Sequence, residues 1–212
     1  MSGYETAQLS ELEEIQVGDT TLVWRPVRRR FDVRAFGVNA YTAAEAGDEV
    51  VEQHTESANE HEELYVVLAG HATFTVGEEE VDAPTGTLIF IRDPALRRHA
   101  VARESNTSVL AVGGRAGAAY EVSAWEYWFA ANPAYKAGDY DAAVELMLAG
   151  LSERPDHPAL LYNLACYEAL AGRLDDAQAH LSRAFELDPK TREWAKDDED
   201  LAGLKKDGTL PF

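Results

Sequence analysis

The chain has 212 residues, with 19 Lys and Arg against 38 Asp and Glu, so its formal net charge at pH 7 is −19. This balance argues against nucleic acid or an anionic membrane as a partner, because both bind proteins largely through Lys and Arg. The 46% hydrophobic content is enough for packed cores, and the length favours two domains.

The N-terminal residues 1–19 are acidic and lack an apolar core, so they read as a polar lead-in and not as a signal peptide. No apolar run approaches membrane-spanning length. We therefore expect a cytoplasmic protein. Strand-like patterns begin at residues 21–25 and continue over 31–42, where a phase slip in the alternation predicts a bulge.

One local basic cluster interrupts this acidic chain; it consists of Arg25, Arg28, Arg29, Arg30 and Arg34. Such a cluster could bind an anion or an acidic partner. The favoured interpretation is a solvated strand edge that is protected against pairing with another edge. The sequence leaves both interpretations open.

Short β-branched and aromatic runs then recur every eight to twelve residues, separated by Gly-containing turns. The expected strands are residues 47–54, 63–68, 71–76, 79–82, 87–91, 99–103 and 107–112. Even spacing without intervening helices predicts an antiparallel β-barrel or a double-sheet jelly roll over residues 20–113.

A linker is expected at residues 114–122, because alanine, leucine and aromatic residues at helical spacing follow it. The helical half repeats with a period of 34 residues, which relates Gly138 to Gly172, Ala143 to Ala177, and Pro155 to Pro189. That period is typical of tetratricopeptide (TPR) helix pairs. The predicted class is therefore α+β multidomain, a β-domain followed by an all-α array.

The helical domain is expected over residues 123–206, with a capping helix at 191–206 and a tail at 207–212. Pro133 predicts a break in the first helix, with Asn132 capping the restart. The single cysteine, Cys166, lies in an apolar helical pattern and is expected to be a buried packing thiol.

Glu63 is followed by Gly70 with the interior Leu-Tyr-Val-Val-Leu-Ala, and Pro94 is followed by His99. In these two motifs the β-domain resembles the cupin superfamily, of the small single-domain type. The resemblance covers residues 20–113. It implies a small-molecule site inside the β-domain and a homodimer, but no single activity, because cupins include enzymes, binding proteins and storage proteins.

Metal-binding cupins carry His-x-His a few residues before the glutamate, and this chain has none there. The expected ligands are instead His54, His61, Glu63 and His99, a set that suits one divalent ion such as Fe, Mn, Ni or Zn. In the alternative interpretation His54 and His61 are solvated loop residues and no metal or other cofactor binds. Tyr65 and Phe90 are expected to line the ligand site, with Arg97 or its neighbour Arg98 pointing inward.

The TPR resemblance covers most of the remaining chain and implies an interaction surface for a protein partner. Asn132 and Asn163 match the asparagines of the family's peptide-carboxylate clamp. Trp128, Glu193 and Asp197 stand where the clamp has basic residues, so carboxylate capture is not expected.

Three functions remain open at this point. The first is a small-ligand-binding protein of cupin type, with or without a divalent metal, that carries a TPR interaction segment. The second is a metal-dependent oxygenase or isomerase acting on a small polar substrate, with catalytic residues not identified. The third is a structural dimerisation module or scaffold.

Overall fold

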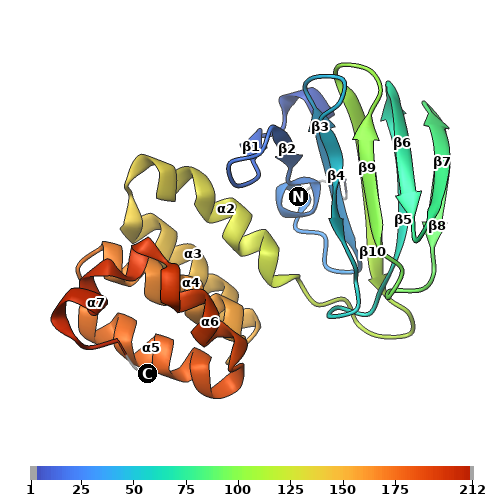
Figure 1. The fold of residues 1–212 in the computed structure, drawn as a ribbon. Helices are drawn as coiled ribbons and strands as arrows, with labels where there is room; N and C mark the ends of the chain where they lie inside the picture. Colours follow the sequence, from blue (N-terminus) through green and yellow to red (C-terminus); the bar gives the residue numbers. More distant parts are fainter. Residues whose placement is uncertain (1–3, 211–212) are drawn as a thin grey trace. The chain divides into compact units, whose positions relative to one another are not determined.

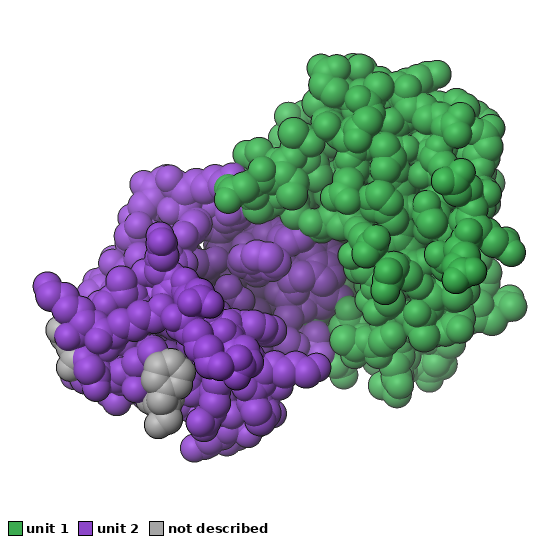
Figure 2. All heavy atoms as spheres, viewed as in Figure 1, with its two compact units in different colours: residues 1–122 green, residues 123–212 purple. Residues whose placement is uncertain are grey.

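The computed structural model describes residues 4–210, so the first three residues of the lead-in and the last two of the tail lie outside the described part. The chain divides into two compact units, with the division between Val122 and Ser123 (Figure 2). Unit 1 holds all the described strands, and unit 2 is helical (Figure 1).

From residue 4 onward, unit 1 contains ten strands, a short helix α1 and a 3-10 turn η1. In chain order these elements are η1 (Leu9–Glu11), β1 (Ile15–Gln16), β2 (Leu22–Arg25), α1 (Val27–Phe31), β3 (Gly37–Ala43), β4 (Glu49–His54), β5 (His61–Ala69), β6 (His71–Val76), β7 (Glu79–Pro84), β8 (Leu88–Ile91), β9 (Arg98–Ala102) and β10 (Thr107–Arg115).

The strands form two antiparallel sheets. One has the order β1-β2-β3-β10-β5-β8 and the other the order β4-β9-β6-β7. Within the described residues the two sheets remain separate ladders, so the double-sheet alternative fits and a closed barrel is not confirmed. Their inner faces share one hydrophobic core.

The core forms because alternate residues of each strand point to the same face. On β5, Tyr65 and Val67 are buried in it, and Val109 from β10 and Phe74 from β6 join them. The same alternation of side chains between the two faces of a strand determines which polar side chains near the strand ends also face inward.

The first part of the expected strand 31–42 differs in the structure. Residues 27–31 form the short helix α1, and Asp32 then adopts the left-handed conformation at φ 48°. The phase slip within residues 31–42 therefore comes from a helix and a turn, not from a β-bulge, and β3 begins only at Gly37. The arginine-rich run suits a helix because Arg loses little side-chain entropy there.

Unit 2 consists of helices joined by short turns. In chain order they are α2 (Ala124–Ala137), α3 (Tyr140–Glu153), α4 (Pro158–Leu170), α5 (Leu174–Leu187), α6 (Lys190–Asp197), the 3-10 turn η2 (Glu199–Leu201) and α7 (Ala202–Asp207). Successive helices α2 to α5 pack on one another. No helix in residues 4–210 is both long and apolar enough to cross a membrane.

The expected break at Asn132 is wrong, because α2 runs without interruption past Pro133. Pro133 is exposed on the helix surface and removes only one backbone hydrogen bond, while Phe129 and Ala131 of the same helix are buried. Packing of the apolar face is what stabilises most protein helices, and here it outweighs the lost bond.

The repeat pattern accounts for the turns and for the close helix contacts. Gly138 and Gly172, which follow α2 and α4, have φ of +74° and +79°, values that glycine adopts without steric cost. Ala143 and Ala177 are fully buried, and Cys166 is buried on α4 as its apolar context predicts.

Candidate functional site

A cluster of ionisable side chains lies at the start of β5, on the face that continues into the core of unit 1. Because residues two apart share a face, His61 and Glu63 follow the same side of the strand as the buried Tyr65. The side chain of Glu63 is only 13% exposed. Strand β5 thus places the Glu63 carboxylate at the edge of the core.

Three side chains converge on one oxygen of Glu63. The Tyr65 hydroxyl donates a hydrogen bond of 2.6 Å to Glu63 Oε2. Arg98 Nη1 lies 3.4 Å from the same atom and His54 Nε2 lies 3.7 Å from it. Arg98 is completely buried on β9, so its charge can be balanced only inside the protein.

Glu56, in the connection between β4 and β5, brings a second carboxylate to the cluster. Its side chain is 10% exposed, and the Asn59 amide donates to its Oε2 at 3.0 Å. His61 Nδ1 lies 3.4 Å from Oε2, and His54 Nε2 lies 3.6 Å from Oε1. Glu56 therefore sits between the two histidines.

The imidazole of His54 is oriented by the backbone. Its Nδ1 lies 2.7 Å from the carbonyl oxygen of Glu52, which is a hydrogen bond in which Nδ1–H donates. This directs Nε2 toward Glu56 and Glu63. Histidines that ligate metals are held in the same way, with the second ring nitrogen donating to a carbonyl or carboxylate.

The cluster shifts the pKa values of its members. Burial lowers the pKa of His54, but the contacts with Glu63, the Glu52 carbonyl and Glu56 outweigh burial and raise it above its usual value. Burial raises the pKa of Glu63, yet its contacts with His54 and Tyr65 and the charge of Arg98 hold it below its usual range. Burial and then the charge of Glu63 raise the pKa of Glu56.

These residues fit a divalent cation. One ligand atom each from His54, Glu56 and Glu63 lies within 4.8 Å of the others, and His61 is adjacent. Imidazole and carboxylate donors suit zinc and first-row transition metals, and the donor set alone does not choose among them. With neutral imidazoles, the two carboxylates and Arg98 leave one net negative charge for a cation to balance.

The structure does not bring His99 to this cluster. His99 is the second residue of β9 and faces the opposite side from Arg98, where its Nε2 lies 2.9 Å from Glu49 Oε1. The inward position at this end of β9 is taken by Arg98. A shift of one residue in strand phase thus exchanges an expected ligand for a buried cation.

Of the residues expected to line the ligand site, some are buried at the cluster and others are exposed away from it. Tyr65 is buried and bonded to Glu63. Phe90 points to the outer face of β8 and is 51% exposed, with the Arg92 guanidinium 5.3 Å from its ring centroid. Arg97 is exposed just before β9. Of the arginine pair, the inward residue is Arg98.

Sequence reasoning missed Glu56 as a member of the site. It lies in the polar segment between two strands, and a loop carboxylate has no periodicity that indicates burial. The only available signal was its position between His54 and His61.

The candidate interaction residues of unit 2 lie on different parts of their helices. Trp128 is 45% exposed on α2 and contacts the ring of Phe129. Asn132 is half-buried within the same helix. Asn163 donates its amide to the carbonyl of Ala159, one turn earlier on α4, at 2.8 Å.

A half-buried carboxylate, that of Asp198, joins α4 to η2 in unit 2. Asp198 accepts hydrogen bonds from the Tyr162 hydroxyl at 2.7 Å and from the backbone amide of Asp200 at 3.0 Å. The Cys166 thiol lies 3.6 Å from the same carboxylate. These contacts hold the C-terminal elements on the last helix pair.

Comparison with known proteins finds one matching family model and several similar solved structures. Residues 134–196 match the family model described as tetratricopeptide repeat. Solved structures similar to the chain include a cupin protein from Bacteroides fragilis, with 18% identity and a TM-score of 0.41, covering 58% of this chain and 93% of the other. The comparison with curated protein sequences finds no match.

Two further similar structures are described as sugar phosphate isomerases. One, from a cupin superfamily, comes from Silicibacter pomeroyi, with 17% identity, a TM-score of 0.44, and coverage of 52% of this chain and 76% of the other. The second, a putative one from Acidithiobacillus ferrooxidans, has 22% identity and a TM-score of 0.44, and covers 53% and 74%. The tetratricopeptide model and the cupin descriptions of these structures agree with the two families that the sequence motifs resemble. Likeness at this level carries no information about ligand, metal or reaction.

Proposed function

We propose that unit 1 binds one divalent metal ion through His54, Glu56 and Glu63, with His61 as a further donor, and that it thereby holds a small polar ligand. The observation that carries this proposal is the convergence of the three ligand atoms within 4.8 Å. The proposal makes the chain a cupin-type binding protein with a TPR segment.

The orientation and charge of the cluster support a cation. His54 is turned by the Glu52 carbonyl so that Nε2 faces two carboxylates. Without a cation, that nitrogen satisfies the carboxylates only when it carries a proton, which agrees with the raised pKa of His54. Metal and proton therefore compete for one position, and affinity for metal should fall as the pH is lowered.

The Arg98 guanidinium limits what can bind beside Glu63. It lies against Glu63 Oε2, together with the Tyr65 hydroxyl. The other carboxylate oxygen of Glu63 is the better ligand atom, because like charges in a buried site repel each other strongly. Arg98 thereby keeps Glu63 ionised and oriented.

Metal content and affinity test this proposal. Protein purified without chelator is analysed by elemental analysis, and the metal-free protein is titrated with Mn²⁺, Ni²⁺ and Zn²⁺ by calorimetry. Wild type should bind one ion per chain, and Glu56→Gln should weaken binding about tenfold or more. His99→Ala is the matched control, because His99 also contacts a carboxylate but on the outer face.

Two results would overturn the metal proposal. One is the absence of stoichiometric binding for all three ions by the wild type. The other is a loss in His99→Ala equal to the loss in Glu56→Gln, since that would place the ion outside the cluster.

We further propose that unit 1 pairs with a second copy through the outer face of β10, β5 and β8. The strand register aligns two apolar rows there, Leu110–Val66–Leu88 and Val112–Leu64–Phe90. Leu88 is 64% exposed, and β8 is an edge strand of its sheet.

This outer face is suited to contact with a second copy of the chain. The two rows contain no charged residue, and the rim holds an ion pair between Arg92 and Glu62 at 3.9 Å, which can face its own symmetry mate without net repulsion. Analytical ultracentrifugation should find a dimer for wild type and for Glu80→Lys on β7, and a monomer for Phe90→Glu. A monomeric wild type at about 50 μM would refute the pairing.

A further inference from the structure

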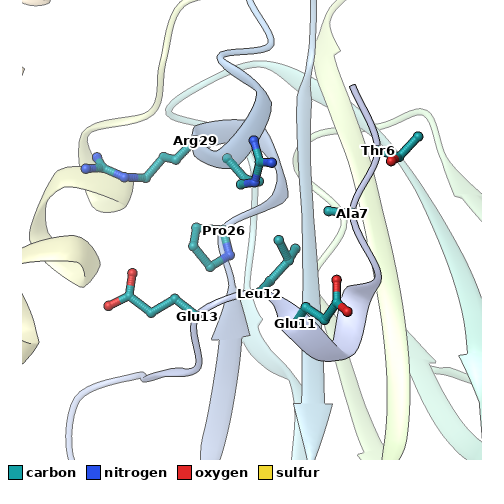
Figure 3. Close-up of a pocket in the computed structure, with 8 residues that line it drawn as sticks. Thr6, Ala7, Glu11, Leu12, Glu13, Pro26 and Arg29 are labelled. Atoms are coloured by element: carbon teal, nitrogen blue, oxygen red, sulfur yellow. The ribbon is translucent and has the colours of Figure 1, made fainter. Parts of the chain in front are cut away.

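A cavity in unit 1, away from the ionisable cluster, lies between the N-terminal segment and α1 (Figure 3). Its volume is about 400 Å³, within the range of small-molecule sites. The apolar lining comes from Leu12, Pro26 and Ala7, of which Leu12 is 8% exposed and Pro26 is buried. An apolar lining of this kind favours an aliphatic or aromatic group.

One wall of this cavity belongs to the arginine-rich helix α1. Arg28 is buried and donates to the carbonyl of Val33, and Arg30 pairs with Glu5 at 3.0 Å. Arg29 lines the cavity, is half-buried, and has no ion pair or side-chain hydrogen bond within residues 4–210. Within the described chain its five N–H donors are thus open to an anionic group.

The N-terminal segment supplies a carboxylate to the cavity. Glu11 accepts the backbone amide of Gln8 in a capping box, so its charge is engaged locally. Glu13 is exposed, lines the cavity, and has no partner in the described part of the chain. Figure 3 shows Arg29 and Glu13 extending to the same side of the cavity, with Pro26 between them.

We propose that this cavity binds a small zwitterion with an apolar side chain, the chemistry of an aliphatic or aromatic α-amino acid. The ligand carboxylate pairs with the Arg29 guanidinium, its ammonium group donates to the Glu13 carboxylate, and its side chain lies on Leu12 and Pro26. The basic cluster of the sequence thereby acquires a role other than protecting a strand edge.

The charge of the whole chain favours a zwitterion over a simple anion. A net charge of −19 repels anions at long range, whereas a zwitterion carries no net charge and gains from both walls. A cation lacking a carboxylate leaves Arg29 without a partner. The site should therefore discriminate by requiring both charges on one ligand.

Three probes with the same isobutyl group test this requirement: L-leucine, L-leucinamide and 4-methylpentanoate. Each is titrated into the full-length protein at pH 6.5 and followed by ligand-observed and ¹⁵N NMR. L-leucine should bind roughly tenfold more tightly than either singly charged probe, because each lost ionic hydrogen bond costs about that factor or more.

Variants then locate the binding. Arg29→Gln and Glu13→Gln should each weaken L-leucine binding about tenfold, while the control variants Arg97→Gln and Glu78→Gln, which change exposed residues outside the cavity, should leave it unchanged. Equal affinity for all three probes, no binding of L-leucine at about 10 mM, or full affinity in Arg29→Gln would each overturn the proposal. The probe comparison uses wild-type protein, so it decides even if a variant misfolds.

Discussion

Removal of the Glu63 charge should destabilise unit 1 far more than removal of the charge of its sequence neighbour Glu62. Glu63→Gln keeps the shape of the side chain but takes away the anion that lies 3.4 Å from Arg98 Nη1. Arg98 is fully buried, and its Nε and Nη1 have no hydrogen-bond partner among residues 4–210. The substitution therefore leaves an uncompensated buried cation.

The magnitude follows from this burial. Breaking a buried ion pair from one side costs about 3 to 5 kcal/mol of unfolding free energy. Glu63 keeps 13% side-chain exposure, and Gln can still accept the Tyr65 hydroxyl, so we expect about 3 kcal/mol. The neighbouring Glu62 points outward, is 35% exposed, and lies 3.9 Å from Arg92, so Glu62→Gln should cost less than about 1 kcal/mol.

The assay must report unit 1 separately from unit 2, because a two-unit chain need not unfold in a single step. Amide exchange measured by mass spectrometry in urea, on peptides that cover β5 and β10, does so. The protein is kept metal-free, so that lost metal binding does not add to the effect. With m of about 1 to 3 kcal/mol/M, a loss of about 3 kcal/mol moves the urea midpoint down by about 1 to 3 M.

Equal midpoints for Glu63→Gln and Glu62→Gln would refute this reasoning. That result would mean that Arg98 finds water or another acceptor, and that the pair with Glu63 is not its main compensation. Arg98→Met combined with Glu63→Gln provides the closing test. It removes both charges together and should recover most of the stability lost in Glu63→Gln alone.

Two further predictions concern pH and backbone conformation. Because the pKa of folded His54 is raised, its contribution to the stability of metal-free protein is complete below about pH 6.5 and is lost as the pH rises through the raised value. The stability advantage of wild type over His54→Gln, measured by urea unfolding with NMR detection, should shrink toward alkaline pH, and an advantage that grows would contradict the assignment. Gly70→Ala should cost about 3 kcal/mol or more, because φ is +72° and the new Cβ would lie 2.8 Å from Thr107 Cα. Gly86→Ala, at φ +88° with no described atom within 4 Å, should cost only about 1 to 2 kcal/mol, so equal losses in thermal unfolding would show that the contact with Thr107 is unimportant.

The strands of unit 1 and the helix turns of unit 2 illustrate what local sequence pattern can predict. Regular alternation and glycine-bounded turns were enough to place most strands of unit 1, since each strand buries every second residue. The 34-residue period likewise predicted the helix turns at Gly138 and Gly172 and the buried Ala143 and Ala177, and residues 134–196 match a TPR model.

The sequence alone thus predicted a β-rich half and a helical half, and it offered His54, His61 and Glu63 as members of one candidate site while leaving solvated histidines as the alternative. Only the tertiary structure decided the rest of that cluster. Whether Arg98 or His99 faces inward depends on the phase of β9, and a single-residue shift exchanges the two. Glu56 joins because a loop returns it between the two histidines, and no local pattern encodes such a return. The same limit applies to the expected strand 31–42, where the fold formed the end of α1 and a turn before β3 begins at Gly37.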